Sequence, residues 1–123
     1  MPFRRNAKNV RDPEAVVLIS VKGSKSIVLG CGGCGWRNCE EFESADKKLG
    51  RDLVGPTCIF KALDLRIALR SAAKTASMLN VDNCIMYCID TAAIKPKSIP
   101  EATVMMGIPI SAKGKNVYYD RVK

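Results

Sequence analysis

The stretch GPTCIFKALDLRIALRSAAKTASML, residues 55–79, predicts the longest helix of the chain. Pro56 suits the first helical position, because the N–H that proline lacks has no partner there. Apolar residues then recur in steps of three and four, which predicts one buried helix face. That face comprises Ala62, Leu65, Leu69, Ala72, Ala76 and Leu79. Cys58 lies four residues before Ala62, so we expect it at the head of this face.

Short apolar runs on both sides of this helix predict strands. They are AVVLISV (15–21), which SIVLG (26–30) extends or follows as a second strand, CIMYCI (84–89), ATVMMGIPI (102–110) and VYY (117–119). Since strands alternate with helices, we expect an α/β fold with a mostly parallel sheet of about three to four strands and a long central helix. We expect a single domain over residues 1–123, with a cysteine-rich segment, 30–60, inserted after the first strand.

The segment NCEEFESADKKLG, residues 38–50, predicts a shorter helix. Asn38 suits its N-cap, Glu41 completes a capping box, and Gly50 suits its C-cap. Cys39 and Cys58 then both fall in the first turn of a helix. The positive end of the helix dipole favours a thiolate at that position.

Composition narrows the class of protein. The chain has 123 residues, is 47% hydrophobic and 26% charged, and has no apolar window long enough to cross a membrane. The N-terminus is basic but lacks the apolar region of a secretory signal, so we expect a cytoplasmic protein with reduced thiols. The net charge of +8 comes from scattered basic residues, and few residues are aromatic. A solvated basic surface therefore explains the charge better than a nucleic-acid interface.

The chain has no histidine. This excludes catalytic Ser-His-Asp and Cys-His pairs and any imidazole metal ligand. Six cysteines remain, and Cys31, Cys34, Cys39 and Cys58 have the spacing C-x2-C-x4-C-x18-C. Four thiols suit a tetrahedral four-sulfur site that holds zinc or an iron–sulfur cluster.

The spacing favours a [4Fe-4S] cluster over zinc, because structural zinc sites usually contain two C-x2-C pairs and this chain has one. Glycines at positions 30, 32, 33 and 35 let the backbone fold closely around an inorganic core and direct N–H groups at its sulfides. We therefore interpret this segment as a cysteine-rich iron–sulfur loop. Zinc and a thiol–disulfide switch remain the alternatives.

CGGCGWRNCEEF followed by GPTC resembles the C-G-x-C-G-x3-C…C iron–sulfur domain of corrinoid iron–sulfur proteins and of the B subunit of Rnf-type electron-transport complexes. From about residue 6 to 121 the chain resembles an uncharacterised ferredoxin-domain-containing family of archaea and anaerobic bacteria. The resemblance implies a [4Fe-4S] cluster on the same four cysteines and implies no known reaction. Members of that family carry an additional N-terminal segment, so we expect a short or truncated member.

Two cysteines and one basic row lie outside this ligand set. Cys84 and Cys88 are expected on one strand, about 13 Å apart, where they act as small core residues. Arg66, Arg70 and Lys74 form a cationic row at helical spacing, for which a solvated face is the simpler explanation.

The function we expect is [4Fe-4S] cluster binding, for electron transfer or redox sensing with a redox protein partner. Two alternatives remain: a zinc-stabilised interaction module, and an iron–sulfur enzyme subunit that binds an anionic substrate near Ser111, Lys113 and Lys115. The catalytic residues, if the chain is an enzyme, are unknown. A homo-oligomer is compatible with each of these functions.

Overall fold

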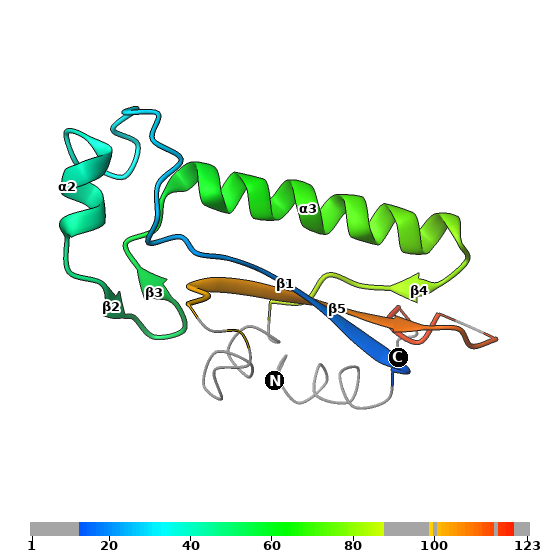
Figure 1. The fold of residues 1–123 in the computed structure, drawn as a ribbon. Coiled ribbons are helices and arrows are strands. Elements are labelled where there is room, and N and C mark those ends of the chain that lie inside the picture. Colours follow the sequence, from blue (N-terminus) through cyan, green and yellow to red (C-terminus); the bar gives the residue numbers. More distant parts are fainter. Residues whose placement is uncertain (1–12, 88–98, 100, 115, 120–123) are drawn as a thin grey trace.

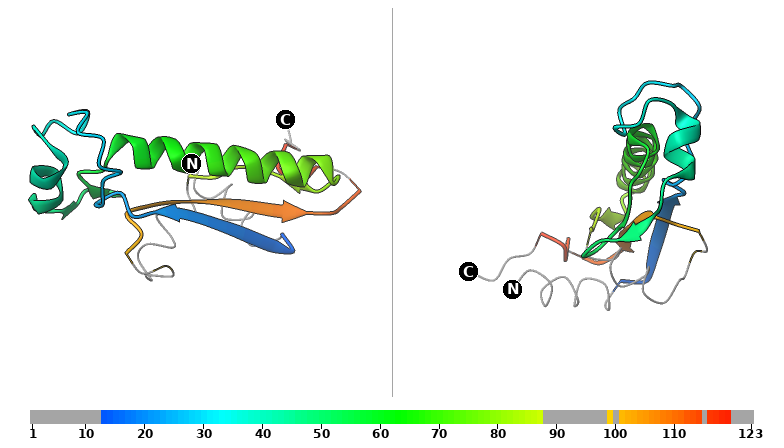
Figure 2. Two further views of the ribbon diagram at one scale, coloured as in Figure 1. Left: turned by 45° about the horizontal axis from the view of Figure 1, so that its top comes forward. Right: turned by 90° about the vertical axis from the view of Figure 1, so that its left-hand side faces the viewer.

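A long helix packed along one face of a small sheet forms the frame of the protein (Figure 1). The structure, a computed structural model, describes residues 13–87, 99, 101–114 and 116–119. Its elements are, in order, β1 (Ala15–Val21), α2 (Cys39–Ser44), β2 (Lys48–Leu49), β3 (Val54–Gly55), α3 (Ile59–Met78), β4 (Asp82–Asn83) and β5 (Val104–Ser111). α2 and the β2–β3 hairpin lie beyond the N-terminal end of α3, away from the three-stranded sheet (Figure 2).

The sheet has the order β1-β5-β4, and both of its strand pairs are antiparallel. The prediction of a mostly parallel sheet is therefore wrong. β1 precedes α3 in the chain and β4 follows it, and these two strands do run in the same direction, as a β-α-β pattern predicts. β5 comes later in the chain and inserts between them in the opposite direction, so every ladder becomes antiparallel.

Pro109 explains why the run CIMYCI does not form one continuous strand. Gly107 exchanges backbone hydrogen bonds with Met86. Along β5, the backbone N–H and C=O groups of Gly107 and of every second residue after it therefore point towards the side of β5 on which β4 lies. Pro109 is the next such residue and has no N–H to donate. Pairing therefore stops between the Met86 bridge and β4, which pairs with residues 110–111.

Alternation along β5 divides the core into two layers. Ile108 faces α3, where it packs with Leu65 and Leu69. Other apolar side chains of β1 and β5 complete this layer: Ile19, Val21, Val104, Met106 and Ile110. The opposite face carries a second cluster built on Met86 and Tyr118. Of the predicted helix face, Leu65 and Leu69 are buried, while Ala62 and Leu79 at its ends are exposed.

Both predicted helices exist, with shorter bounds. α3 begins at Ile59 rather than at Pro56, and Cys58 is its N-cap. α2 ends at Ser44, well before Gly50. At this end the Phe42 carbonyl accepts from the Ala45 N–H and also from the Lys47 ammonium, which lies over the Phe42 ring.

The remaining strand predictions fail or cannot be assessed. Residues 26–30 form a loop, and residues 117–119 form a turn. Residues 88 and 89 of the predicted strand 84–89 lie outside the described residues. The segment TAAIKPKSI (91–99), for which the sequence predicts a short helix or turn, is described only at residue 99. Within the described ranges, no helix combines the length and apolar character needed to cross a membrane.

Candidate metal centre

The four predicted ligand cysteines lie on three segments at one end of the protein. Cys31 and Cys34 are in the loop that leaves β1, Cys39 is the first residue of α2, and Cys58 is the N-cap of α3. Figure 1 shows this loop rising beside the start of α3 before the chain enters α2. Cys58 is distant from the other three cysteines in the sequence, but the chain returns through the β2–β3 hairpin to the same end of the protein.

The turn between Cys31 and Cys34 depends on glycine. The Gly35 N–H donates to the Gly32 carbonyl at 3.0 Å and closes the turn. Gly32 and Gly35 have φ angles of 72° and 93°, which residues with a side chain rarely adopt. Glycine therefore allows a tight turn at these positions, while its role around an inorganic core stays a prediction.

Cys39 is positioned by the N-terminus of α2. The Asn38 side-chain oxygen accepts from the Glu41 N–H at 2.8 Å, as the capping box predicts. The Glu41 carboxylate accepts from the N–H of Arg37 rather than that of Asn38. The Gly30 N–H donates to the Cys39 sulfur at 3.3 Å, so the loop contacts this thiol directly.

Cys58 is 7% exposed and is fixed by its backbone N–H, which donates to the Gly23 carbonyl at 2.9 Å. Burial alone raises the pKa of its thiol. The backbone N–H groups of Lys61 and Ile27, followed by that of Phe60, outweigh burial and hold the pKa below its ordinary value. The Cys58 side chain itself makes no cap hydrogen bond with α3.

Gly23 joins β1 to the start of α3. Its N–H donates to the Thr103 hydroxyl at 2.7 Å, while its carbonyl accepts from Cys58. A Cβ at Gly23 would lie 2.4 Å from a Thr57 methyl carbon, so only glycine fits without a shift. The sequence alone does not reveal the role of Gly23, because its partners are distant in the sequence.

A second close contact holds the cysteine loop against α3. A Cβ at Gly33 would lie 2.4 Å from Ile59 Cδ1 and 3.6 Å from the Cys31 sulfur. Ile59 directly follows Cys58, so Gly33 brings the loop thiols to the same end of α3 as the fourth thiol.

Glu43 anchors the beginning of the loop to α2. Its carboxylate accepts from the Ser26 N–H at 3.0 Å, from the Ser26 hydroxyl at 2.8 Å and from Lys25 Nζ at 3.1 Å. These interactions, led by the Ser26 hydroxyl, lower the pKa of Glu43 to about 2. Glu43 was not among the predicted site residues, because nothing local distinguishes it from the other acidic residues of α2.

We expect Glu43→Gln to remove an acid-sensitive part of the stability. The carboxylate stabilises the fold above the ordinary glutamate pKa of 4.5, and this contribution disappears as the pH falls towards 2. The native metal-free chain should therefore be more stable than Glu43→Gln at pH 7, and the difference should close on acidification. Urea unfolding over this pH range measures the difference, and a constant difference would contradict the assignment.

Aromatic residues near the loop pack against each other. Trp36 and Phe42 meet edge to face with ring centroids 5.8 Å apart, and Phe42 is fully buried. The two rings therefore pack together and help to hold α2 beside the loop.

The ligand set itself remains a prediction. Among the described residues, no three cysteine, aspartate or glutamate side chains form a group that could hold one metal ion. Cys84 is not part of this end of the protein. It packs against the Met86–Tyr118 cluster, as expected for a small core residue. Cys88 and Lys115 lie outside the described residues.

Comparison with known proteins identifies the family. Residues 54–121 match the family described as "Uncharacterized protein containing a ferredoxin domain (DUF2148)". The chain belongs to this family. The match to the DUF2148 family includes Cys58 and α3, while Cys31, Cys34 and Cys39 precede it.

An "Uncharacterized protein" of Archaeoglobus fulgidus is 47% identical over 119 residues, which is 97% of this chain and 64% of that protein. The chain thus spans less than two thirds of the length of the curated relative that it matches. No solved structure matches the chain. The resemblance to a ferredoxin-domain family is confirmed, and its description is compatible with iron–sulfur binding.

Proposed function

We propose that this chain binds a [4Fe-4S] cluster through Cys31, Cys34, Cys39 and Cys58 and uses it to transfer or sense electrons. The observation that carries the proposal is that one loop contacts both the Cys39 thiol and the residue that follows Cys58. The Gly30 N–H donates to the Cys39 sulfur at 3.3 Å, and Gly33 packs so closely on Ile59, the residue after Cys58, that a Cβ would not fit. Backbone N–H groups directed at ligand sulfurs are a means by which proteins bind such clusters and set their potential.

The donor chemistry fits this group. All four side chains are thiols, and none forms a disulfide. The lowered pKa of Cys58 favours the thiolate, which is the form that binds a metal. When bound, the cluster supplies one-electron chemistry. The chain supplies the two helix N-termini, the N–H groups and the packing that keeps these thiols at one end.

The zinc alternative places a different demand on the same residues. A zinc ion needs its four sulfurs at about 2.3 Å, in one tetrahedron with no sulfide between them. The single C-x2-C pair favours the larger inorganic core, because structural zinc sites usually contain two such pairs.

Electron paramagnetic resonance of anaerobically purified protein tests the electron-transfer function. We expect a signal from the reduced cluster after dithionite is added, and its reversible loss on reoxidation. A cluster that dithionite does not reduce, or that is destroyed in one redox cycle, would contradict this function and leave cluster binding alone.

A further inference from the structure

We propose that the outer face of α3 docks an acidic electron-carrier protein, so that electrons enter and leave beside Cys31. This inference rests on the proposed function and names the partner class of the same site. We call this face the docking face. It comprises the exposed side chains Ile59, Leu63, Ile67, Arg66, Arg70 and Lys74.

The apolar half of the docking face begins at the metal centre. Ile59, Leu63 and Ile67 follow one another at four-residue steps and are 41%, 48% and 67% exposed. The Ile59 side chain lies against Gly33, so this row continues into the cysteine loop. Val28 and Leu29, which are close in sequence to Cys31, are exposed on the loop as well. Contiguous exposed apolar surface of this kind marks an interaction site.

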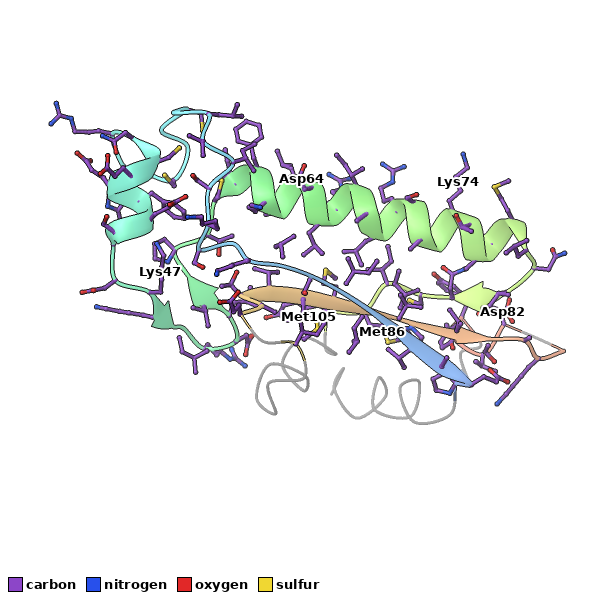
Figure 3. The ribbon with its side chains drawn as sticks, viewed as in Figure 1. Lys47, Asp64, Lys74, Asp82, Met86 and Met105 are labelled. Carbon is purple, nitrogen blue, oxygen red and sulfur yellow. The ribbon has the colours of Figure 1, made fainter. Side chains whose placement is uncertain are left out.

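The cationic half extends along the same helix. Arg66, Arg70 and Lys74 are spaced by four residues, and Asp64 is the single acidic residue of α3. None of the three cations forms an ion pair with a described residue. Figure 3 shows Lys74 on the side of α3 away from the sheet. Such a row is mildly unfavourable for the helix on its own, so an acidic partner would stabilise it.

Charge selects this partner over a second copy of the chain. A two-fold interface places the same patch of both copies face to face, so Arg66, Arg70 and Lys74 would oppose their own kind. An acidic partner instead gains attraction along the row and a faster encounter. The combination of a small apolar centre with a charged margin matches the weak, transient complexes of electron-transfer proteins.

Duplex DNA is the other anionic partner to consider. The half of the docking face nearest the metal centre is aliphatic and offers no charge for a phosphate and no aromatic ring for a base. The apolar row begins at Ile59, directly after Cys58, so a partner that binds this row approaches the metal centre. A protein electron carrier fits both features.

The test uses an acidic flavodoxin as the probe, with the full chain purified anaerobically. Binding is measured by fluorescence anisotropy at low and high salt, about 0.02 and 0.3 M. In the stopped-flow experiment, one electron leaves the dithionite-reduced cluster, and the flavin quinone takes it with one proton to become the neutral semiquinone. Binding does not require the cluster, so failure of docking and failure of the proposed function give different results.

We expect Arg66→Glu/Arg70→Glu to weaken binding at low salt at least about tenfold and to slow electron transfer equally. The matched control is Lys48→Glu/Arg51→Glu on the β2–β3 hairpin, which changes the net charge by the same amount. It should change binding by less than about twofold. Leu63→Ser/Ile67→Ser should also weaken binding while the salt dependence remains.

Three results would overturn the proposal. The first is no binding of flavodoxin by the native chain, and the second is an equal loss of binding in the control variant. The third is binding of duplex DNA, or a dimer in sedimentation velocity, that the Leu63→Ser/Ile67→Ser variant abolishes. A chain that binds flavodoxin through Arg66 and Arg70 but takes up no iron or sulfide on anaerobic reconstitution would refute the cluster and leave the docking face established.

Discussion

Cys58→Ser should abolish the cluster. Cys58 is the buried thiol that the N-terminus of α3 presents, and the serine hydroxyl neither ionises at neutral pH nor binds iron comparably. We expect bound iron to fall from about four per chain to a small fraction of that value. Iron and acid-labile sulfide analysis after anaerobic reconstitution measures the loss, and the visible absorbance should fall in parallel.

Cys84→Ser is the matched control for this experiment. Cys84 is also a free, partly buried thiol, but it packs against the Met86–Tyr118 cluster on the sheet. This variant should retain its iron and sulfide, apart from a modest loss of stability. If Cys84→Ser lost the cluster and Cys58→Ser kept it, the proposed ligand set would be wrong.

Leu69→Ala should cost about 2–5 kcal/mol of unfolding free energy. Leu69 is 3% exposed and packs with Leu65 of α3 and Ile108 of β5 at the centre of the main core. Removing its side chain leaves a cavity between the helix and the central strand, which neither element can close without moving the other. Chemical denaturation under anaerobic conditions measures the change.

Ile67→Ala provides the control for core packing. It lies two residues away on the same helix and is 67% exposed. We expect its unfolding free energy to change by about 0.5 kcal/mol or less. Equal losses in the two variants would mean that the outer face of α3 is packed in solution, against both the fold and the docking proposal.

Features set by neighbouring residues were predictable from the sequence. Asn38 caps α2 through a bond to the N–H of Glu41, three residues away, and the four-residue periodicity around Leu65 and Leu69 locates the buried side of α3. β5 was predicted almost in full from its apolar run. In each case the residues that interact are close in the sequence, so the local sequence pattern is enough to predict the feature.

Features that depend on distant partners were not predictable. Strand direction in the sheet is decided by β5, which enters between β1 and β4, and local periodicity contains no information on that order. The bond from Gly23 to Thr103 spans 80 residues, and that from Ser26 to Glu43 spans 17. These contacts position the start of α3 and the cysteine loop, so the sequence indicated the thiols without showing what holds them.

Chemical analysis of iron, acid-labile sulfide and zinc in the anaerobically reconstituted native chain tests the central claim most directly. The account predicts about four irons and four sulfides per chain, with no stoichiometric zinc. One zinc per chain without sulfide would contradict it and establish a structural zinc site on the same thiols.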